Sequence, residues 1–356
     1  MGNQQHILVA PLDWGLGHAT RCIPIIHELL RQQCKVSIAG SGNSLILLRK
    51  EFPSLSFFTL PSYNIRYASR LSFTLQMMLN VPGIMQAITA EHRQIQQIVR
   101  EQKIDGIISD NRYGCWSASV KTVFISHQLS IQMPKGLGWM KGWVNRWQQK
   151  YIRKFSECWV PDDPQHSLAG DLSPSTSPAK RIGILSRFEG FAPDNNYANQ
   201  VLVLLSGPEP QRSILQELCI QQLASSGKSG AIIQGLPEEY RKQIRDGLTI
   251  YTHLATNELA KVIQTSEIIV CRSGYSSLMD LLTLRKGKLI LVPTPGQTEQ
   301  EYLANRLHQM GRVVMQPQRA LNLMDAFREV EIRNGFVSWA TTSNLLPQTI
   351  REWLSR

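Results

Sequence analysis

The sequence predicts an α/β protein made of two Rossmann-like domains that face each other across a cleft. Its 356 residues exceed the usual size of one domain. Short apolar runs alternate with helical patterns in both halves, as in parallel sheets joined by crossover helices. Between the halves the composition changes to Ser, Pro, Gly and Asp, which indicates a linker. The expected division is an N-terminal domain at 1–167, a linker at 168–198, a second domain at 199–335 and a terminal helix in 336–356.

The first half opens with a strand–helix–strand pattern. The first strand is predicted at Ile7–Ala10, the helix at His18–Arg31 and the second strand at Lys35–Ala39. The glycine loop before the helix is not a dinucleotide fingerprint, because Thr20 stands where the third glycine belongs and no acidic residue closes the second strand. NAD is therefore disfavoured. Further strands are predicted at 56–60, 106–109 and 122–125.

Polar residues follow several of these strands. The carboxyl ends of the strands in an open parallel sheet face the ligand crevice. We therefore expect four side chains to converge on one cleft, namely Asp13, His18, Asp110 and His127. His18 falls at the start of a helix, where the dipole lowers the pKa of an imidazole and favours its neutral form.

The second half repeats the order of strand, glycine loop and helix. It begins with a strand at Val201–Leu205, which Ser206 and Gly207 follow, and a helix from about Gln211. Helices separate the later strands, and a last helix is expected at 345–353. The later strands are predicted at 231–234, 248–251, 268–271 and 289–292.

The stretch 268–305 predicts an anion site. A buried strand runs into Arg272-Ser273-Gly274, and the following helix carries Leu278, Leu281 and Leu282 on one apolar face. The free N–H groups of the first helical turn and the helix dipole both favour an anion above the glycine. After the next strand comes a polar loop rich in Gln and Glu.

Composition and charge restrict the class of protein. No apolar run is long enough to span a bilayer, and the N-terminus lacks the features of a secretion signal. The six cysteines are scattered without a CxxC pair, which is typical of reduced core cysteines in a cytosolic protein and disfavours a metal site. The net charge of +11 indicates an anionic partner, which could be nucleic acid, an anionic membrane surface or a phosphorylated ligand.

Part of this charge lies in residues 134–154, which read PKGLGWMKGWVNRWQQKYIRK. Residues 67–85 are also aromatic and Met-rich, with Arg66 and Arg70 at their start. Cationic helices with Trp suit an anionic membrane, although an aromatic stripe packed within its own domain is an equal alternative. No RNA- or DNA-binding motif accompanies the charge, so nucleic acid is not expected. Aromatic residues recur every four positions in 134–154 and are expected on one helix face: Trp139, Trp143, Trp147 and Tyr151.

The order of features in 268–305 resembles the donor half of GT-B glycosyltransferases. The run IIVCRSG, Asp280 six positions after its glycine, VP and the Gln/Glu-rich loop are most similar to the family that includes the N-acetylglucosaminyltransferase of lipid II synthesis. In that family the glycine turn and helix N-terminus hold the nucleotide diphosphate. The acid in the helix takes the ribose hydroxyls, and the Gln-rich loop takes the sugar hydroxyls. The family usually has Glu where this chain has the shorter Asp280.

The resemblance implies a donor site in the C-terminal domain. Backbone amides would hold the diphosphate without a metal ion or a cofactor, and a carboxylate suits two vicinal hydroxyls. Leu254 stands in the segment that reads uracil through backbone groups, and two further glycine loops resemble those near the donor phosphates. The implied donor-binding residues are Gly15, Gly17, Ser206, Gly207, Leu254, Arg272, Ser273, Gly274, Tyr275, Ser276, Asp280, Gln297, Glu299, Gln300 and Glu301.

The resemblance also implies an inverting transfer, in which one base takes the proton of the acceptor hydroxyl. His18 is the first candidate for this base, with Asp13 and Asp110 behind it. The expected activity is transfer of a sugar from a UDP-sugar to an acceptor held by the N-terminal domain, at the cytoplasmic side of a membrane if the acceptor is a lipid. Two alternatives stay open: hydrolysis or epimerisation of a UDP-sugar, and nucleotide-sugar binding without catalysis.

Overall fold

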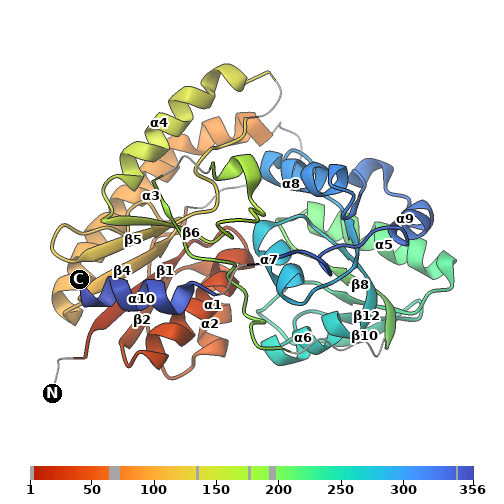
Figure 1. Cartoon of the computed structure of the whole chain (residues 1–356), viewed down its shortest axis with the longest axis horizontal. Coiled ribbons are helices and arrows are strands. Elements are labelled where there is room, and N and C mark those ends of the chain that lie inside the picture. Colours follow the sequence, from red (N-terminus) through yellow and green to blue (C-terminus); the bar gives the residue numbers. More distant parts are fainter. Residues whose placement is uncertain (1–3, 64–72, 134–135, 175–177, 192–197, 342–343) are drawn as a thin grey trace. The chain divides into compact units, whose positions relative to one another are not determined.

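The computed structural model describes residues 4–63, 73–133, 136–174, 178–191, 198–341 and 344–356 (Figure 1). The chain divides into two compact units. Unit 1 comprises residues 1–186 and 341–356, and unit 2 comprises residues 187–340. Within the described residues each unit contains one seven-stranded sheet. Arg66 and Arg70, in the predicted aromatic segment, lie outside the described residues. None of the described helices combines the length and the apolarity that a bilayer span requires.

The described strands of unit 1 form a parallel sheet with the order β3-β2-β1-β4-β5-β6-β7. The direction of winding reverses between β1 and β4, which are hydrogen-bonded neighbours although β2 and β3 separate them in the sequence. Such a reversal leaves a crevice at the carboxyl ends of the two strands. The strands are β1 (His6–Pro11), β2 (Lys35–Gly40), β3 (Ser56–Thr59), β4 (Gly106–Asp110), β5 (Lys121–Ile125), β6 (Glu157–Val160) and β7 (Lys180–Arg181).

Helices cover the sheet of unit 1 through their apolar faces. The apolar residues that recur at helical spacing in the first helix are buried at Ile23, Ile26 and Leu29, whereas Leu30 is exposed. Further along the chain, Ile95 and Val99 pack in one cluster with Leu8 of β1. The helices of unit 1 are α1 (Leu16–Arg31), α2 (Gly42–Glu51), α3 (Phe73–Gln102), α4 (Lys141–Ile152) and α10 (Leu346–Ser355), with short 3-10 turns η1 (Gly138–Met140) and η2 (Gly170–Leu172).

The C-terminal helix α10 returns to unit 1, where it lies in blue among the red and orange elements (Figure 1). Trp353 is buried against Trp159 of β6, with ring centroids 5.9 Å apart. Gly106 makes room for this ring, because a Cβ at Gly106 would lie 2.6 Å from Trp353 Cη2. Lys121 Nζ donates to the carbonyls of Trp353 and Leu354, which are among those that the helix itself leaves unpaired. The predicted terminal helix is therefore a part of unit 1.

The boundary between the units falls at residues 186 and 187, inside the predicted linker. Unit 1 extends beyond the predicted end at 167, because β7 adds a further strand beside β6. Arg181 of β7 also donates to Asp162 at 3.2 Å, and the amide of Leu168 donates to the same carboxylate at 2.8 Å. A strand of two residues is too short to produce a pattern in the sequence, so composition alone could not reveal it.

The sheet of unit 2 has the order β10-β11-β9-β8-β12-β13-β14. The β10–β11 pair is antiparallel and the other described pairs are parallel. The winding reverses between β8 and β12, which gives unit 2 the same kind of crevice as unit 1. The strands are β8 (Asn199–Leu204), β9 (Gly230–Ile233), β10 (Lys242–Arg245), β11 (Leu248–Tyr251), β12 (Ser266–Cys271), β13 (Lys288–Leu291) and β14 (Val314–Met315).

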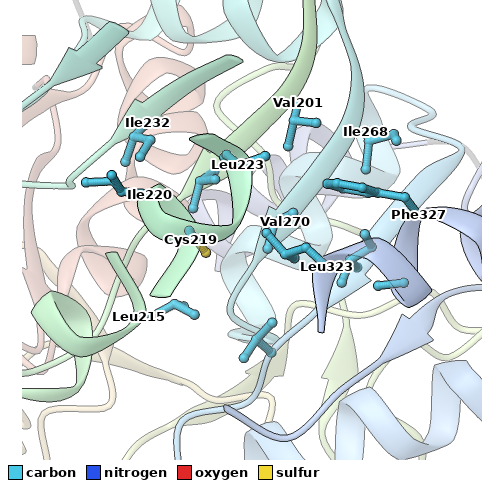
Figure 2. Close-up of a cluster of buried hydrophobic side chains, with 14 of the residues drawn as sticks. Val201, Leu215, Cys219, Ile220, Leu223, Ile232, Ile268, Val270, Leu323 and Phe327 are labelled. Carbon is cyan, nitrogen blue, oxygen red and sulfur yellow. The ribbon is translucent and has the colours of Figure 1, made fainter. Parts of the chain in front are cut away.

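An apolar cluster of unit 2 lies between its sheet and two helices (Figure 2). Val201 of β8 and Val270 of β12 point into it, as every second residue of a strand does. Helix α5 contributes Leu215 and Cys219, and α9 contributes Phe327. The helices of unit 2 are α5 (Gln211–Ser226), α6 (Thr256–Gln264), α7 (Tyr275–Thr283), α8 (Thr298–Gln309) and α9 (Leu323–Val330), with the 3-10 turn η3 (Gln318–Ala320).

Two segments predicted as loops begin helices instead. The polar segment after Pro293 enters α8, whose first turn contains Glu299 and Glu301. Acidic residues are favoured there because the helix N-terminus carries partial positive charge. The sequence Gly-Ser-Gly-Asn after the second strand predicts a turn, and it similarly opens α2 at Gly42.

The aromatic residues of 134–154 do not share one helix face, contrary to the prediction. Trp147 and Tyr151 pack into an apolar cluster with residues of α3, whereas Trp143 is 67% exposed and Trp139 79% exposed. Trp139 lies in η1, before α4 begins at Lys141. A four-residue spacing also drifts by about 40° at each step on a helix with 3.6 residues per turn. The equal spacing therefore spreads the rings over inner and outer faces.

Candidate functional site

Two predicted residues of unit 1 meet where its strand order reverses. His18 lies in the first turn of α1, directly after β1, and Asp110 is the last residue of the neighbouring strand β4. The distance between His18 Nδ1 and Asp110 Oδ1 is 3.0 Å. The side chain of Asp110 is fully buried and that of His18 is 14% exposed. A histidine–carboxylate pair thus lies at the ligand crevice of a Rossmann-like sheet.

Arg21 fixes the position of this pair. It follows His18 by three residues on the same face of α1 and is 2% exposed. Its Nε and one terminal nitrogen donate to the two oxygens of Asp110, and the other terminal nitrogen donates to His127 Nδ1 at 3.0 Å. The predicted convergence of His18, Asp110 and His127 is present. Arg21 was not among the predicted site residues, although an arginine three positions from His18 in an apolar helix was a usable signal.

Burial and charge set the protonation of the pair. Burial raises the pKa of Asp110, but the Arg21 guanidinium and His18 outweigh that effect and lower the pKa to about 2. For His18, burial and then the charge of Arg21 lower the pKa below the ordinary value, more than Asp110 raises it. At neutral pH the site therefore combines an ionised Asp110 with a neutral His18.

The ionised Asp110 also selects the tautomer of His18. A carboxylate only accepts hydrogen bonds, so it favours the imidazole with its proton on Nδ1 and its lone pair on Nε2. One terminal nitrogen of Arg21 also lies 2.7 Å from this Nδ1 and has a second N–H besides the one that it donates to Asp110, so the assignment of the tautomer rests on the hydrogen bond to the ionised carboxylate. Among the described residues His18 forms hydrogen bonds only through Nδ1. Its Nε2 is therefore the atom with the chemistry of a general base.

Asp13 belongs to a separate polar cluster. Its Oδ2 accepts hydrogen bonds from Ser41 at 2.8 Å and from Ser62 at 2.6 Å. Its Oδ1 is buried without a hydrogen-bond partner among the described residues and lies 3.9 Å from the fully buried Arg112. Arg112 is itself paired with Glu91 of α3. No hydrogen bond in the described part of the chain joins Asp13 to His18, so Asp13 is not part of the hydrogen-bonded group of His18, Arg21 and Asp110.

The glycine loops of unit 2 flank the second reversal of strand order. Gly207 follows β8, and its φ of 94° is a conformation that residues with a side chain rarely adopt. A Cβ on Gly207 would lie 3.6 Å from Thr294 Oγ1. The Thr294 hydroxyl is buried and has no hydrogen-bond partner among the described residues. A buried hydroxyl left unpaired is costly, so its position beside a glycine loop marks it as a group available to a ligand.

Gly274 at the start of α7 has a different role. Its φ of −67° and ψ of 136° are open to any residue, so the turn does not depend on glycine. A Cβ there would meet only Ser277 Oγ, at 4.0 Å. The absence of a side chain instead leaves space over the first turn of α7, which begins with Tyr275 and Ser276. This is the geometry of an anion site at a helix N-terminus.

Arg272 and Ser273 direct their side chains into their own unit rather than toward a ligand. Arg272 is fully buried and donates to the carbonyl of Val292 at 3.0 Å and to Gln318 Oε1 at 2.6 Å. Burial lowers the pKa of Arg272 to about 10. Ser273 Oγ donates to the carbonyl of Gln300 at 2.7 Å. These side chains fasten the glycine turn, and only its backbone remains for the predicted donor role.

Asp280 lies in the second turn of α7 and is 8% exposed. Arg187 Nε lies 3.4 Å from its Oδ2, and the Arg187 guanidinium also covers the ring of Phe188. The carboxylate has acceptor positions beyond this ion pair, so pairing with Arg187 is compatible with hydroxyl ligands. Arg187 was not among the predicted site residues, because it lies far from Asp280 in the sequence and within the predicted linker.

The predicted sugar-binding residues gather at the start of α8. Gln300 is 8% exposed, and its Oε1 accepts from the amide of Thr294 at 2.9 Å while its Nε2 donates to Gln297 Oε1. Glu301 is exposed and accepts from the amide of Gly296 at 3.1 Å. Glu299 is half-buried in the same turn. Gln300 therefore shapes the segment that carries Thr294.

The remaining predicted residues lie at the carboxyl edges of the two sheets. Gly15 is the N-cap of α1 with a φ of 87°, and Gly17 follows in the first turn. Ser206 is half-buried between β8 and Gly207. Leu254 follows β11 and is 3% exposed, but β9 separates β11 from β8 in the sheet. Its side chain is thus a core side chain.

Comparisons with known proteins agree with this architecture. Residues 227–331 match the sequence profile described as the glycosyltransferase family 28 C-terminal domain. A search of curated proteins found no significant match to the sequence. Among solved structures, MurG of Acinetobacter baumannii is similar with a TM-score of 0.58 and 13% identity, over 99% of this chain and 100% of that chain. The calicheamicin glycosyltransferase CalG4 gives a TM-score of 0.64 and 12% identity over 99% of both chains.

A third similar structure is the spinosyn rhamnosyltransferase SpnG complexed with thymidine diphosphate, with a TM-score of 0.59 and 12% identity over 99% of this chain and 96% of that chain. Identities this low establish the fold. The profile match and the fold together support glycosyl transfer as the class of reaction. The predicted resemblance and fold class are thereby confirmed: the chain has the GT-B glycosyltransferase fold, similar to that of MurG, with a C-terminal segment that matches glycosyltransferase family 28.

Proposed function

We propose that the protein transfers a sugar from a nucleoside diphosphate, most specifically from UDP, to a hydroxyl acceptor with inversion at the anomeric carbon. The observation that carries this proposal is the His18–Asp110 pair, with Nδ1 anchored and Nε2 left as the basic atom. A protein that only binds nucleotide sugars has no use for an oriented, neutral imidazole. An inverting transfer needs a base that takes the proton of the acceptor hydroxyl, and a neutral imidazole can act as that base.

His18 would act on the acceptor. Its Nε2 takes the proton of the acceptor hydroxyl while the oxygen forms a bond to the anomeric carbon and the bond to the diphosphate breaks. The imidazolium that results lies beside Asp110, whose negative charge stabilises it, as the carboxylate of a catalytic triad does. Arg21 keeps Asp110 ionised and in place, so it is a positioning residue.

The donor would bind at the glycine loops of unit 2. The first-turn amides of α7 and the helix dipole suit the diphosphate and the negative charge that grows on it as it leaves. The Thr294 hydroxyl supplies one further donor beside Gly207. Asp280 is one and a half turns along α7, where its carboxylate suits the ribose hydroxyls. These groups supply the charge stabilisation that a metal ion would otherwise give, so we propose a metal-independent reaction.

Uracil is proposed as the nucleobase of the donor, because the resemblance places Leu254 in a segment that reads uracil through backbone groups. The similar structure SpnG is complexed with thymidine diphosphate, which supports a pyrimidine nucleoside diphosphate as the class of ligand. A membrane lipid is the proposed acceptor, which would place the reaction at the cytoplasmic face of a membrane.

The test compares donor binding with turnover. Isothermal titration with UDP, TDP and GDP identifies the nucleotide, and radiolabelled UDP-sugars are then incubated with and without membrane lipids. Sugar that appears in the lipid fraction supports transfer. Release of free sugar in the absence of an acceptor would show that the protein is a hydrolase and not a transferase. Binding without any turnover would show that it only binds nucleotide sugars. Chelation of metals by EDTA should not reduce the rate.

His18→Gln tests the base. Loss of general base catalysis should reduce kcat about 10²- to 10⁴-fold, while the dissociation constant of UDP stays unchanged. His166→Gln is a matched control, because His166 lies in the same unit with a side chain that is 44% exposed. Full activity in His18→Gln would remove His18 from the mechanism.

A further inference from the structure

The net charge of the protein lies almost entirely in unit 1. This unit contains 22 Lys and Arg residues against 12 Asp and Glu, a net charge of +10. Unit 2 contains 16 against 15, a net charge of +1. A phosphorylated donor bound by the glycine loops of unit 2 therefore does not account for the charge. Unit 1 requires an anionic partner of its own.

Within unit 1 the charge concentrates around α4. Residues 134–154 contain six Lys or Arg and no Asp or Glu. Arg146, Lys150 and Arg153 of this segment are exposed, and none of the three forms an ion pair within the described residues. In the core of the same unit, Arg21 and Arg112 are buried and paired with carboxylates. The charge on α4 is thus exposed and uncompensated, whereas the charge in the core is neutralised.

The exposed charges share one side of α4 with a tryptophan. Trp143, Arg146, Lys150 and Arg153 are separated by three, four and three residues, which places them along one side of the helix. Trp139 precedes them in η1 and has the largest exposed fraction of any large apolar side chain described. We call Trp139 and these four residues the α4 outer face. A shallow hollow of about 450 Å³ runs along it, lined by Gly142, Asn145, Arg146, Gln149, Lys150 and Arg153.

The opposite side of α4 holds the helix against unit 1. Trp147 and Tyr151 pack in a cluster with Ile84 and Ile88 of α3, beside which α4 runs (Figure 1). Tyr151 also donates to Met85 Sδ at 3.7 Å. The outer face is therefore presented by a helix whose position is fixed. Two exposed indoles on such a helix are costly in water unless a partner covers them.

We propose that the α4 outer face docks on an anionic phospholipid bilayer. The guanidinium and ammonium groups match the phosphates of the headgroups, and indole rings are favoured at the boundary between headgroups and acyl chains. The two tryptophans precede the three charges along the chain, so the rings can enter the interface while the charges remain among phosphates. A nucleic acid would also attract the charges, but it gives no comparable reason for two exposed indoles.

The proposal is tested by co-sedimentation of the full chain with vesicles, without nucleotide or acceptor. Vesicles of phosphatidylcholine with 30% phosphatidylglycerol should bind the protein, vesicles of pure phosphatidylcholine should bind it much less, and added salt should release it. Arg146→Ala with Lys150→Ala should lower the partition coefficient roughly 30-fold, because each basic residue contributes a factor of about five. Trp139→Ala with Trp143→Ala should weaken binding and remove the blue shift of the tryptophan emission.

Arg93→Ala with Arg100→Ala is the matched control. Both arginines are exposed on α3 in the same unit, and their removal changes the net charge by the same amount. An equal loss of vesicle binding in both charge variants would show attraction to the whole unit and overturn the proposal. Binding to duplex DNA that is stronger than vesicle binding, and insensitive to the tryptophan change, would overturn it in favour of nucleic acid. Unchanged melting temperature and UDP affinity confirm that each variant is folded, and they keep this test independent of the proposed transfer reaction.

Discussion

The protonation of His18 gives a pH dependence that can be measured. Burial and Arg21 lower the pKa of His18 below its ordinary value of 6.5, and the proposed base must be neutral. As pH falls, the active form is therefore retained through pH 6.5 and lost only below it. With the acceptor at saturating concentration, we expect kcat/KM for the donor to be independent of pH near neutrality. It should fall with decreasing pH only below pH 6.5. An acid limb at or above 6.5 would contradict the proposed environment of His18.

Thr294 provides a second prediction about a single residue. Valine has nearly the same shape as threonine, so Thr294→Val removes a buried hydroxyl that has no hydrogen-bond partner in the described part of the chain. Stability should stay the same or rise, because an unpaired buried polar group is lost. If the hydroxyl donates to the donor diphosphate, UDP affinity measured by calorimetry should fall about five- to tenfold.

Thr265→Val is the control for this change. The Thr265 hydroxyl donates to the carbonyl of Lys261 at 2.8 Å, at the amino end of β12 and opposite the glycine turn. This variant should lose stability by about 1 kcal/mol and keep its UDP affinity. If UDP affinity falls in Thr265→Val and is unchanged in Thr294→Val, Thr294 is not part of the donor site.

At the scale of elements, the two glycine loops of unit 2 make opposite predictions. Gly274 caps α7 in an ordinary conformation, so Gly274→Ala should lower the free energy of unfolding by no more than about 1 kcal/mol, the usual cost of alanine at an N-cap. Its Cβ would enter the open space at the helix N-terminus and should weaken UDP binding at least tenfold. Gly207 has a φ of 94°, so Gly207→Ala should cost about 1 to 3 kcal/mol of stability.

Chemical denaturation and UDP titration of both glycine variants separate the two effects. A large loss of stability in Gly274→Ala would show that the turn itself needs glycine. Unchanged UDP affinity in the same variant would place the diphosphate elsewhere.

Elements also show where periodicity succeeds and where it fails. The strand–turn–helix units around β1, β8 and β12 were predictable, because buried strands and amphipathic helices impose periods of two and 3.6 on the sequence. The start of α8 was not, since five polar residues in a row produce neither period. The four-residue spacing of the aromatic residues predicted that they share one face of a helix. Because successive positions at this spacing rotate around the helix axis, Trp143 lies on the outer side of α4 and Trp147 on the inner side.

For the whole molecule, the path of the chain makes the stability of unit 1 depend on the C-terminus. Trp353→Ala removes a fully buried ring from between Trp159 and Gly106, which should cost about 3 to 5 kcal/mol. The loss should fall on unit 1, although residue 353 follows unit 2 in the sequence. Phe327→Ala is the counterpart in the core of unit 2.

Denaturation with and without UDP assigns each loss to a unit. UDP at 100 times its dissociation constant adds roughly 2.7 kcal/mol to the unit that binds it. One unfolding transition should move to a higher denaturant concentration when UDP is added. Phe327→Ala should lower the midpoint of that transition, and Trp353→Ala should leave it unchanged. If Trp353→Ala shifts the UDP-sensitive step instead, α10 supports unit 2 and the assignment is wrong.

The sequence by itself determined the α/β class, the two units and the order of glycine turn, acid and polar segment along the donor half. These are local properties, because the hydrophobic periodicity of strands and helices and the positions of glycine turns depend only on residues that are close in the sequence. It also selected His18 and Asp110 as residue types suited to a strand end. Their pairing, and the separate cluster of Asp13, required the tertiary structure.

Only the tertiary structure supplied Arg21, Arg187 and Thr294, and it alone showed that Arg272 and Ser273 face inward. It also showed that α10 completes unit 1. The physical reason is the same in each case: which side chain reaches a carboxylate, fills a core or is left unpaired depends on residues brought together from distant parts of the chain. Periodicity records the burial of a position but not the identity of its partner.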